Sequence, residues 1–371
     1  MYRSRSKTTG SSRDAHLRRA SFSMNESGVA RGEVQTRDLV VIGGSAGALA
    51  VIQRILSDLP SDMPAAIFVA IHLGAISHLP EILGRNTSLP VIAGASGMRI
   101  ERGRVYVAVP DLHLMMHDHH LLLRRGPREN LSRPALDPLF RSAACTFGSR
   151  TIGVLVSGTL NDGTAGLQAI KQCGGLAIIQ DITDATCPEM PASAQRYVEI
   201  DYVRPAAELG PLLLRLAKQP AGVSPPVPER VRLETAIATQ ELGGMNVNDQ
   251  LGTLSRFTCP ECNGALWEMK GEGPLRYRCH IGHALTAETV LSEQAIKTEE
   301  MLWRLMRAHQ ERAELARRMA IQEQSLDRPA LAAELQDRAR GYDEDASVVE
   351  RLLREHRSVV AIGQSDPEEG D

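Results

Sequence analysis

A serine, a histidine and an aspartate each follow a short apolar segment of the chain. Ser45 follows the segment DLVVIGG, His72 ends AAIFVAIH, and Asp162 comes shortly after RTIGVLVSG. A serine hydroxyl becomes nucleophilic when a neighbouring base takes its proton, and an imidazole can do this near neutral pH. A carboxylate on the second imidazole nitrogen orients the ring and stabilises the imidazolium. The three residue types therefore predict acyl-transfer chemistry, provided that the three segments end at one edge of a parallel sheet.

The residues around Ser45 fit such a site. The sequence Gly43-Gly44-Ser45-Ala46-Gly47 allows a tight strand-to-helix turn that exposes the hydroxyl. The backbone N–H of Ala46, at the start of the predicted helix, is the expected oxyanion donor. We expect Gly44, Thr159 and Asn161 to line the oxyanion site or the cleft as well.

Each signal has a plainer interpretation when it is taken alone. The glycine turn could bind a phosphate or a dinucleotide, but the G-x-G-x-x-G spacing is absent and His72, not an acidic residue, closes the next strand. His72 could be a core histidine, and Asp162 a turn former or helix N-cap. The order Ser…His…Asp also differs from the Ser…Asp…His order of α/β-hydrolases. The occurrence of all three residues at strand ends favours the acyl-transfer interpretation.

The elements that must position these residues alternate between strand and helix. Apolar strands are predicted at 38–44, 65–72, 150–158 and 176–181, with amphipathic helices between them. Such alternation predicts an α/β fold with a doubly wound, mostly parallel sheet. A small cysteine-containing module and a helical hairpin follow this domain.

The small module carries metal-ligand spacing. Cys259-x-x-Cys262 is followed, after sixteen residues, by Cys279 and two histidines, His280 and His283. Three thiolates and one imidazole suit a structural zinc ion with tetrahedral geometry. We expect His283 to be the fourth ligand, because adjacent Cys279 and His280 have difficulty pointing at one ion, although spacing alone leaves His280 open. The alternative is a metal-free pair of hairpins with reduced cysteines.

The predicted organisation has six parts. These are a disordered tail at 1–36, a catalytic domain at 37–218, a linker at 219–256, a zinc-ribbon-like module at 257–284, a helical hairpin at 285–360 and a disordered tail at 361–371.

Composition excludes several classes of function. A net charge of −3 and an aromatic content of 4% argue against nucleic-acid binding. No apolar run approaches the roughly 20 residues of a membrane span, so membrane insertion is not expected. The basic N-terminal stretch lacks the apolar segment of a secretory signal. Without such a signal a disulfide framework is not expected, and the chain is assigned to the reducing cytoplasm.

Five stretches resemble a known family. VVIGGSAGALAVI, AIHLG, SRPALDPLF, LVSGTLNDGTAGL and CPEMPASA occur in the order found in the catalytic domain of chemotaxis protein-glutamate methylesterases, the CheB-type family. The resemblance covers about residues 38–218. It places the family's serine, histidine and aspartate on Ser45, His72 and Asp162. The segment FTCPEC…LRYRCHIGHA also resembles a zinc ribbon that follows the esterase domain in some stand-alone relatives.

The resemblance implies a serine hydrolase that needs no cofactor for catalysis. Its substrate would be the γ-methyl ester of glutamyl residues on a methylated, helical chemoreceptor-like protein, and many members also deamidate glutamines there. A separate response regulator or kinase would be a further partner. The alternative function is a signalling scaffold with a slow or inactive esterase site, which binds partners through its C-terminal module.

The chain departs from the family in three respects. Ala46 stands where the family often has threonine, and Thr159 where it usually has methionine; both differences would alter the rate or the substrate. Only a short tail precedes the first predicted strand, so we expect no N-terminal receiver domain and no control through one.

Overall fold

The computed structural model describes residues 35–72, 78–242 and 245–362, all of which belong to one structural unit. The tails predicted for 1–36 and 361–371 lie almost wholly outside the described residues. The described elements, in chain order, are β1 (Leu39–Gly44), α1 (Ala48–Ser57), β2 (Ala66–Ile71), α2 (Leu79–Gly84), β3 (Val91–Ala93), β4 (Val105–Val107), β5 (His113–His117), β6 (His120–Arg124), α3 (Leu136–Phe147), the short 3₁₀ helix η1 (Gly148–Arg150), β7 (Thr151–Leu155), α4 (Thr164–Gln172), β8 (Leu176–Gln180), α5 (Glu189–Tyr197), β9 (Tyr202–Arg204), α6 (Ala206–Ala217), α7 (Glu229–Ala238), α8 (Met245–Leu251), β10 (Gly252–Thr258), β11 (Ala265–Met269), β12 (Arg276–Cys279), β13 (Ala284–Thr286), α9 (Ala287–Ser325) and α10 (Pro329–Ile362).

Seven strands form one parallel sheet in the order β3-β4-β2-β1-β7-β8-β9. The chain builds the sheet outward from β1 on one side and then returns to add β7 on the other side. The predicted doubly wound α/β fold is therefore confirmed. The reversal puts the carboxyl ends of β1 and β7 at the switch point, which is where open parallel sheets place their reactive groups.

The central strands are buried on both faces because helices cover the sheet on both sides. Leu39 and Val41 of β1 pack into the core beneath α3, α4 and α5. Val40 and Ile42 alternate with them and pack against α1, α2 and α6. This two-sided burial explains why the strand sequences are continuous apolar runs without a polar alternate position.

A second, antiparallel sheet has the order β10-β11-β12-β13. It begins at Gly252, five residues before the predicted module boundary. The segment predicted as linker, 219–256, contains the helices α7 and α8. Val231 and Ile237 of α7 are buried in hydrophobic clusters. Tertiary contacts therefore order this segment, which was predicted to be a linker because of its neighbouring prolines.

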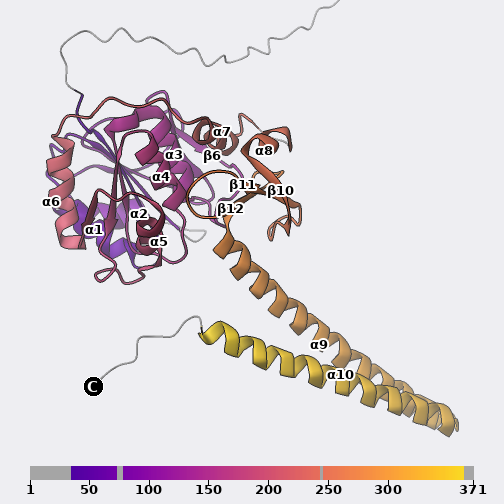
Figure 1. Cartoon of the computed structure of the whole chain (residues 1–371). Coiled ribbons are helices and arrows are strands. Elements are labelled where there is room, and N and C mark those ends of the chain that lie inside the picture. Colours follow the sequence, from indigo (N-terminus) through magenta and orange to yellow (C-terminus); the bar gives the residue numbers. More distant parts are fainter. Residues whose placement is uncertain (1–34, 73–77, 243–244, 363–371) are drawn as a thin grey trace, which may run out of the picture. The chain divides into compact units, whose positions relative to one another are not determined.

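The helices α9 and α10 lie side by side as a hairpin (Figure 1). Small side chains, including Ala313, Ala316 and Ala320, are buried along α9. Among the described residues, no helix combines the length and the apolar character that crossing a bilayer requires.

A buried cluster of charges connects the two sheets. Glu234 of α7 accepts hydrogen bonds from Arg276 Nη1 at 2.8 Å and from Arg278 Nη2 at 3.2 Å, both on β12. Glu129 accepts two hydrogen bonds from Arg141 Nη2 of α3, at 2.6 and 2.8 Å. All five side chains are almost fully buried. Burial disfavours the charge on Glu234, yet the arginines hold its pKa well below the ordinary value.

Replacing Glu234 by alanine is expected to destabilise the protein by about 3–5 kcal/mol, because it leaves buried arginine charges uncompensated. The exposed Glu241→Ala control should change the free energy of unfolding by about 0.5 kcal/mol or less. Urea unfolding followed by tryptophan fluorescence measures both values. Equal stability of the two variants would contradict a structural role for the cluster.

Candidate active site

Ser45 lies directly after β1, in a turn that only small residues permit. Its N–H donates to the carbonyl of Ser157 at 2.9 Å, and its own carbonyl accepts from Ala48 N–H at the start of α1. Gly47, the N-cap of α1, has a φ of 76°, in the left-handed region. A Cβ on Gly44 would lie 2.5 Å from that of Ala48, so no larger residue fits there. The turn therefore holds Ser45 between the first strand and the first helix.

His72 lies beside Ser45 because their strands are paired. Gly44 is in register with Ile71, so the next residues on the two strands, Ser45 and His72, lie on neighbouring strands spaced about 4.8 Å apart. The backbone N–H of His72 also donates to the Gly44 carbonyl at 3.4 Å. His72 Nε2 donates to Asp162 Oδ2 at 2.7 Å, which leaves Nδ1 as the nitrogen that can serve as a base.

The carboxylate of Asp162 is almost fully buried and receives many hydrogen bonds. It lies at the N-terminus of α3, where free backbone N–H groups and the helix dipole favour an anion. Its donors are His72 Nε2 at 2.7 Å, Leu136 N at 2.7 Å, Gly163 N at 3.0 Å, Asn130 Nδ2 at 3.0 Å and Asp137 N at 3.3 Å. Burial alone would raise the pKa of Asp162, but these hydrogen bonds, that from His72 first, hold it below the ordinary value. Asp162 is thus charged and rigidly oriented towards the imidazole.

A second buried carboxyl group, Asp137, lies beside Asp162. Its Oδ1 accepts from Gly166 N–H at 2.6 Å, and its Oδ2 accepts from Asn130 Nδ2 at 3.3 Å. Burial, together with the charge of Asp162, raises the pKa of Asp137 to about 7. The two neighbouring carboxyl groups therefore differ in charge near neutral pH. Asp162 carries the negative charge that faces His72, and Asp137 retains its proton to much higher pH.

The residues predicted to line the oxyanion site differ in their positions. Ala46 and Thr159 are exposed beside the serine turn, and Gly44 is buried at the end of β1. Asn161 was expected to line the oxyanion site or the cleft, but its side-chain amide forms hydrogen bonds with Thr286 and Glu288 in the C-terminal part of the chain. Its Oδ1 accepts from Thr286 Oγ1 at 2.7 Å, since the module packs against the loop that follows β7.

Sequence reasoning missed Asn130 and Ser157. Asn130 precedes the SRPALDPLF stretch and donates directly to Asp162. Ser157 Oγ donates to the Ala46 carbonyl at 2.8 Å and accepts from Cys187 N–H at 2.9 Å. These two hydrogen bonds connect the turn that carries Ser45 to the segment around Cys187. Asn130 follows no predicted strand, and Ser157 lies within the predicted strand 150–158, so its position there did not distinguish it from the other residues of that strand.

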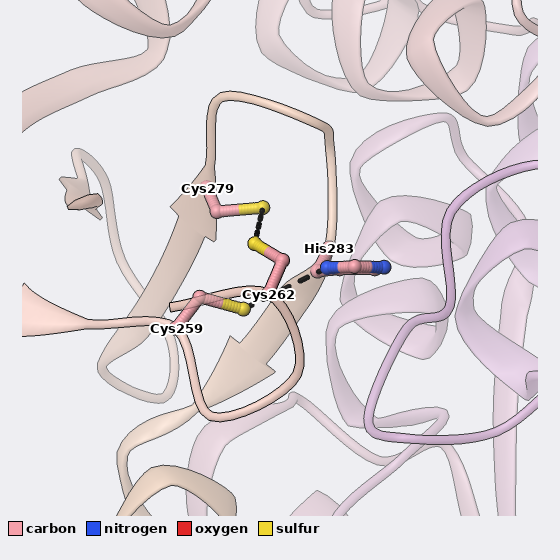
Figure 2. Close-up of side chains that lie close together, drawn as sticks. All are labelled: Cys259, Cys262, Cys279 and His283. Atoms are coloured by element: carbon pink, nitrogen blue, oxygen red, sulfur yellow. Dashed lines mark hydrogen bonds between the residues drawn. The ribbon is translucent and has the colours of Figure 1, made fainter. Parts of the chain in front are cut away.

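The four predicted metal ligands come together at the tips of the small sheet (Figure 2). The ligand atoms of Cys259, Cys262, Cys279 and His283 all lie within 4.8 Å of one another. The Sγ atoms of Cys262 and Cys279 are 3.7 Å apart, and Cys259 Sγ is 3.6 Å from His283 Nδ1. Zinc–sulfur bonds of about 2.3 Å in tetrahedral geometry place two sulfurs roughly 3.8 Å apart. The cluster therefore has the dimensions of a zinc site and could bind a metal ion.

Neighbouring groups support His283, and not His280, as the member of this cluster. His283 Nε2 lies 3.1 Å from Glu261 Oε2, so Nδ1 is the nitrogen that faces the sulfurs. His280 packs against Gly264 instead. The hydrogen bond between Cys259 and Cys279 shifts their pKa values in opposite directions, because one thiol keeps the proton that the other thiolate accepts: the pKa of Cys279 is lowered to about 3 and that of Cys259 is raised.

Comparisons with known proteins identify the family of the catalytic part. Residues 40–213 match the family described as CheB methylesterase. A putative protein-glutamate methylesterase/protein-glutamine glutaminase of Leptospira interrogans is 35% identical over 182 residues, which cover 48% of this chain and 94% of the relative. The chain belongs to the CheB methylesterase family.

Other relatives of this family are longer. Protein-glutamate methylesterase/protein-glutamine glutaminase 4 of Geobacter metallireducens is 32% identical over 184 residues, which span 48% of this chain and about half, 53%, of the relative. The crystal structure of the Thermotoga maritima CheB methylesterase catalytic domain matches 49% of this chain and all of that domain, at 32% identity and a TM-score of 0.47. The matched region, residues 40–213, contains all three residues of the predicted triad.

The raised pKa of Asp137 predicts a pH-dependent difference between the wild type and Asp137→Asn. An aspartate that binds its proton more tightly when folded lowers the stability as pH rises from its unfolded pKa, about 3.9, towards 7. The asparagine does not titrate. We therefore expect the free energy of unfolding of the wild type, minus that of the variant, to fall by up to a few kcal/mol between pH 4 and pH 8. Urea unfolding at several pH values checks this, and a constant difference would refute it.

Proposed function

We propose that this chain hydrolyses the γ-methyl esters of glutamyl side chains, with Ser45 as nucleophile, His72 as general base and Asp162 as the group that orients the imidazole. The observation that carries the proposal is the 2.7 Å hydrogen bond from His72 to the buried carboxylate of Asp162. His72 follows β2, the strand that pairs with β1, and Ser45 follows β1. Membership of the CheB methylesterase family supports the ester as substrate.

The reaction proceeds through an acyl-enzyme. Ser45 Oγ attacks the ester carbonyl carbon while His72 Nδ1 takes its proton, and the charge of Asp162 stabilises the imidazolium. The backbone N–H of Ala46 and a neighbouring backbone donor hold the oxyanion. The imidazolium returns its proton to the leaving methanol. Water then attacks the acyl-enzyme with His72 again as base, which releases glutamate and restores Ser45.

The same steps fit a carboxamide substrate, with ammonia leaving in place of methanol. The names of the relatives include protein-glutamine glutaminase, so we include glutamine deamidation in the proposal. The protein substrate is proposed to be a methylated, chemoreceptor-like helical protein. A separate response regulator or kinase as regulator stays a prediction.

Replacing Ser45 by alanine is expected to lower methanol release by at least about 10³-fold, because the nucleophile is lost. The substrate is a receptor fragment that carries glutamyl methyl esters. Ser61→Ala, on an exposed serine, is the control and should retain wild-type turnover. Both variants should melt near the wild type, and a fluorophosphonate probe should label the control but not Ser45→Ala. Wild-type turnover by Ser45→Ala would refute the assignment, and full signalling by that variant in cells would favour the scaffold alternative.

We also propose that the Cys/His cluster holds one structural zinc ion. The ligands would be the sulfurs of Cys259, Cys262 and Cys279 and the Nδ1 atom of His283. The spacing of the ligand atoms and the carboxylate of Glu261 on the second ring nitrogen support this assignment. The ion would be structural, and no chemical step of ester hydrolysis is assigned to it.

The purified chain is expected to contain about one zinc ion per molecule by elemental analysis. Cys279→Ser should lose most of it, because a hydroxyl replaces a thiolate ligand. Cys145→Ser, at a partly buried cysteine of α3 outside the cluster, should keep it. A Cys279→Ser variant with a full zinc complement would rule out this ligand set.

A further inference from the structure

Two residues that hold Asp162 in place are themselves held by the C-terminal module. Asn130 N–H donates to the Ala284 carbonyl of β13 at 2.7 Å, and Asn130 Oδ1 accepts from Thr286 N–H at 3.2 Å. Its remaining amide group, Nδ2, is the one that donates to Asp162 Oδ1 at 3.0 Å. Every strong hydrogen-bonding group of this side chain is thus used, with the module on one side and the catalytic carboxylate on the other.

The second contact is through the residue that precedes Asp162. Asn161 Oδ1 accepts from Thr286 Oγ1 at 2.7 Å, and its Nδ2 donates to Glu288 Oε2 at 2.7 Å. Thr286 is also the N-cap of α9, where its hydroxyl accepts from Thr289 N–H. The corner between β13 and α9 therefore holds two residues next to the catalytic carboxylate: Asn130, which donates to it, and Asn161, which precedes it in the chain.

The loop that carries Asn130 depends on the module for its conformation. Asn130 and Leu131 both have positive φ, at 48° and 64°, and leucine rarely adopts this left-handed conformation. The side chain of Leu131 packs against the hydrophobic cluster of the module, whose members include Cys259 and Cys279. Neighbouring Glu129 forms a bridge with Ala284. Without the module, neither the strained backbone nor the buried Glu129 would have these partners.

The metal cluster and this corner are adjacent in the chain. β12 ends at Cys279 and β13 begins at Ala284, directly after His283, so two of the four predicted ligands, Cys279 and His283, flank the connection between the two strands. Cys279 N–H donates to the His283 carbonyl at 2.9 Å, which closes this connection. An ion bound there would fix the start of β13, and with it the carbonyl that holds Asn130.

We propose that Asn130 is a positioning residue for the His72–Asp162 pair, and that the metal-bound β12–β13 connection holds Asn130 in place, so that metal occupancy sets the esterase rate. The inference rests on the proposed function for its rate measurement. The C-terminal module then contributes to the active site through Asn130. Among the described residues, no hydrogen bond joins the module directly to Ser45 or His72.

The first test uses Asn130→Ala in the full, zinc-loaded chain, with the exposed Asn86→Ala as matched control. Removing a hydrogen bond to a buried carboxylate should lower kcat for methanol release by roughly tenfold or more, with KM unchanged. Zinc content should stay at the wild-type value. The low-field proton NMR signal of the His72–Asp162 hydrogen bond should broaden or vanish in Asn130→Ala and persist in Asn86→Ala. A variant with wild-type kcat and an intact low-field signal would overturn the proposal.

The second test removes zinc from the wild type and from Asn130→Ala with a strong chelator. We expect metal-free wild type to lose kcat by about the same factor as the substitution, and to recover it when zinc is restored. Chelation should cost Asn130→Ala little more, because both changes act through one contact. Equal fold-losses in the two proteins, or an unchanged rate after zinc release, would refute the coupling.

The outcomes separate this inference from the proposed function. A zinc-loaded wild type that releases no methanol contradicts the esterase assignment, whereas the low-field signal still decides whether Asn130 holds the His72–Asp162 pair. If the metal-free chain unfolds as a whole, the metal does not act through Asn130 alone and that part of the proposal is refuted, while the zinc-loaded Asn130→Ala protein and its control decide whether Asn130 positions the pair.

Discussion

The arrangement of this protein depends on keeping one carboxylate charged in a buried place. Asp162 is removed from water, which by itself favours the protonated form. The N-terminus of α3 offsets this cost with backbone N–H groups, and His72 and Asn130 add hydrogen bonds. Asp137, only a hydrogen bond away, has no comparable set of donors, and its pKa is raised. Both carboxyl groups are almost fully buried, so the difference between their pKa values arises from their neighbours. Hydrogen-bond donors, His72 first, lower the pKa of Asp162, whereas the charge of Asp162 adds to burial in raising the pKa of Asp137.

The sheet explains how residues far apart in the chain reach this carboxylate. Parallel strands end at the same edge, and the reversal of strand order beside β1 brings the segments after β1, β2 and β7 together. Close packing also dictates small residues there. Gly158 approaches Ser45 so closely that a Cβ on it would lie 3.0 Å from the Cβ of the serine.

The helix α7 and the strand β12, which lie beyond the matched family region, form a buried interface with the catalytic part. Glu129 and Arg141, from the catalytic part, share buried ion pairs with Glu234 and Arg278, which lie beyond residue 213. Buried ions of this kind stabilise only when all partners are present, so they fix one arrangement of the two parts. A fixed arrangement is what a positioning contact to Asp162 requires.

Local sequence predicted the elements that have strong patterns of their own. The apolar runs at β1, β2 and β7 are unmistakable because both faces of each strand are buried. The cysteine spacing predicted a cluster whose atoms do converge. In contrast, α7 and α8 were not predicted. Prolines directly precede α7, its sequence is only weakly amphipathic, and the packing of buried residues such as Val231 and Ile237 orders it.

By itself, the sequence determined the doubly wound fold and the residue types at the strand ends, because periodicity and glycine turns are local properties. Only the tertiary structure decided which groups surround Asp162. Asn130 and Thr286 are 156 residues apart, and nothing in either local sequence refers to the other. Hydrogen bonds between distant segments depend on where the whole chain brings their atoms, and that information is spread over every packed interface between them.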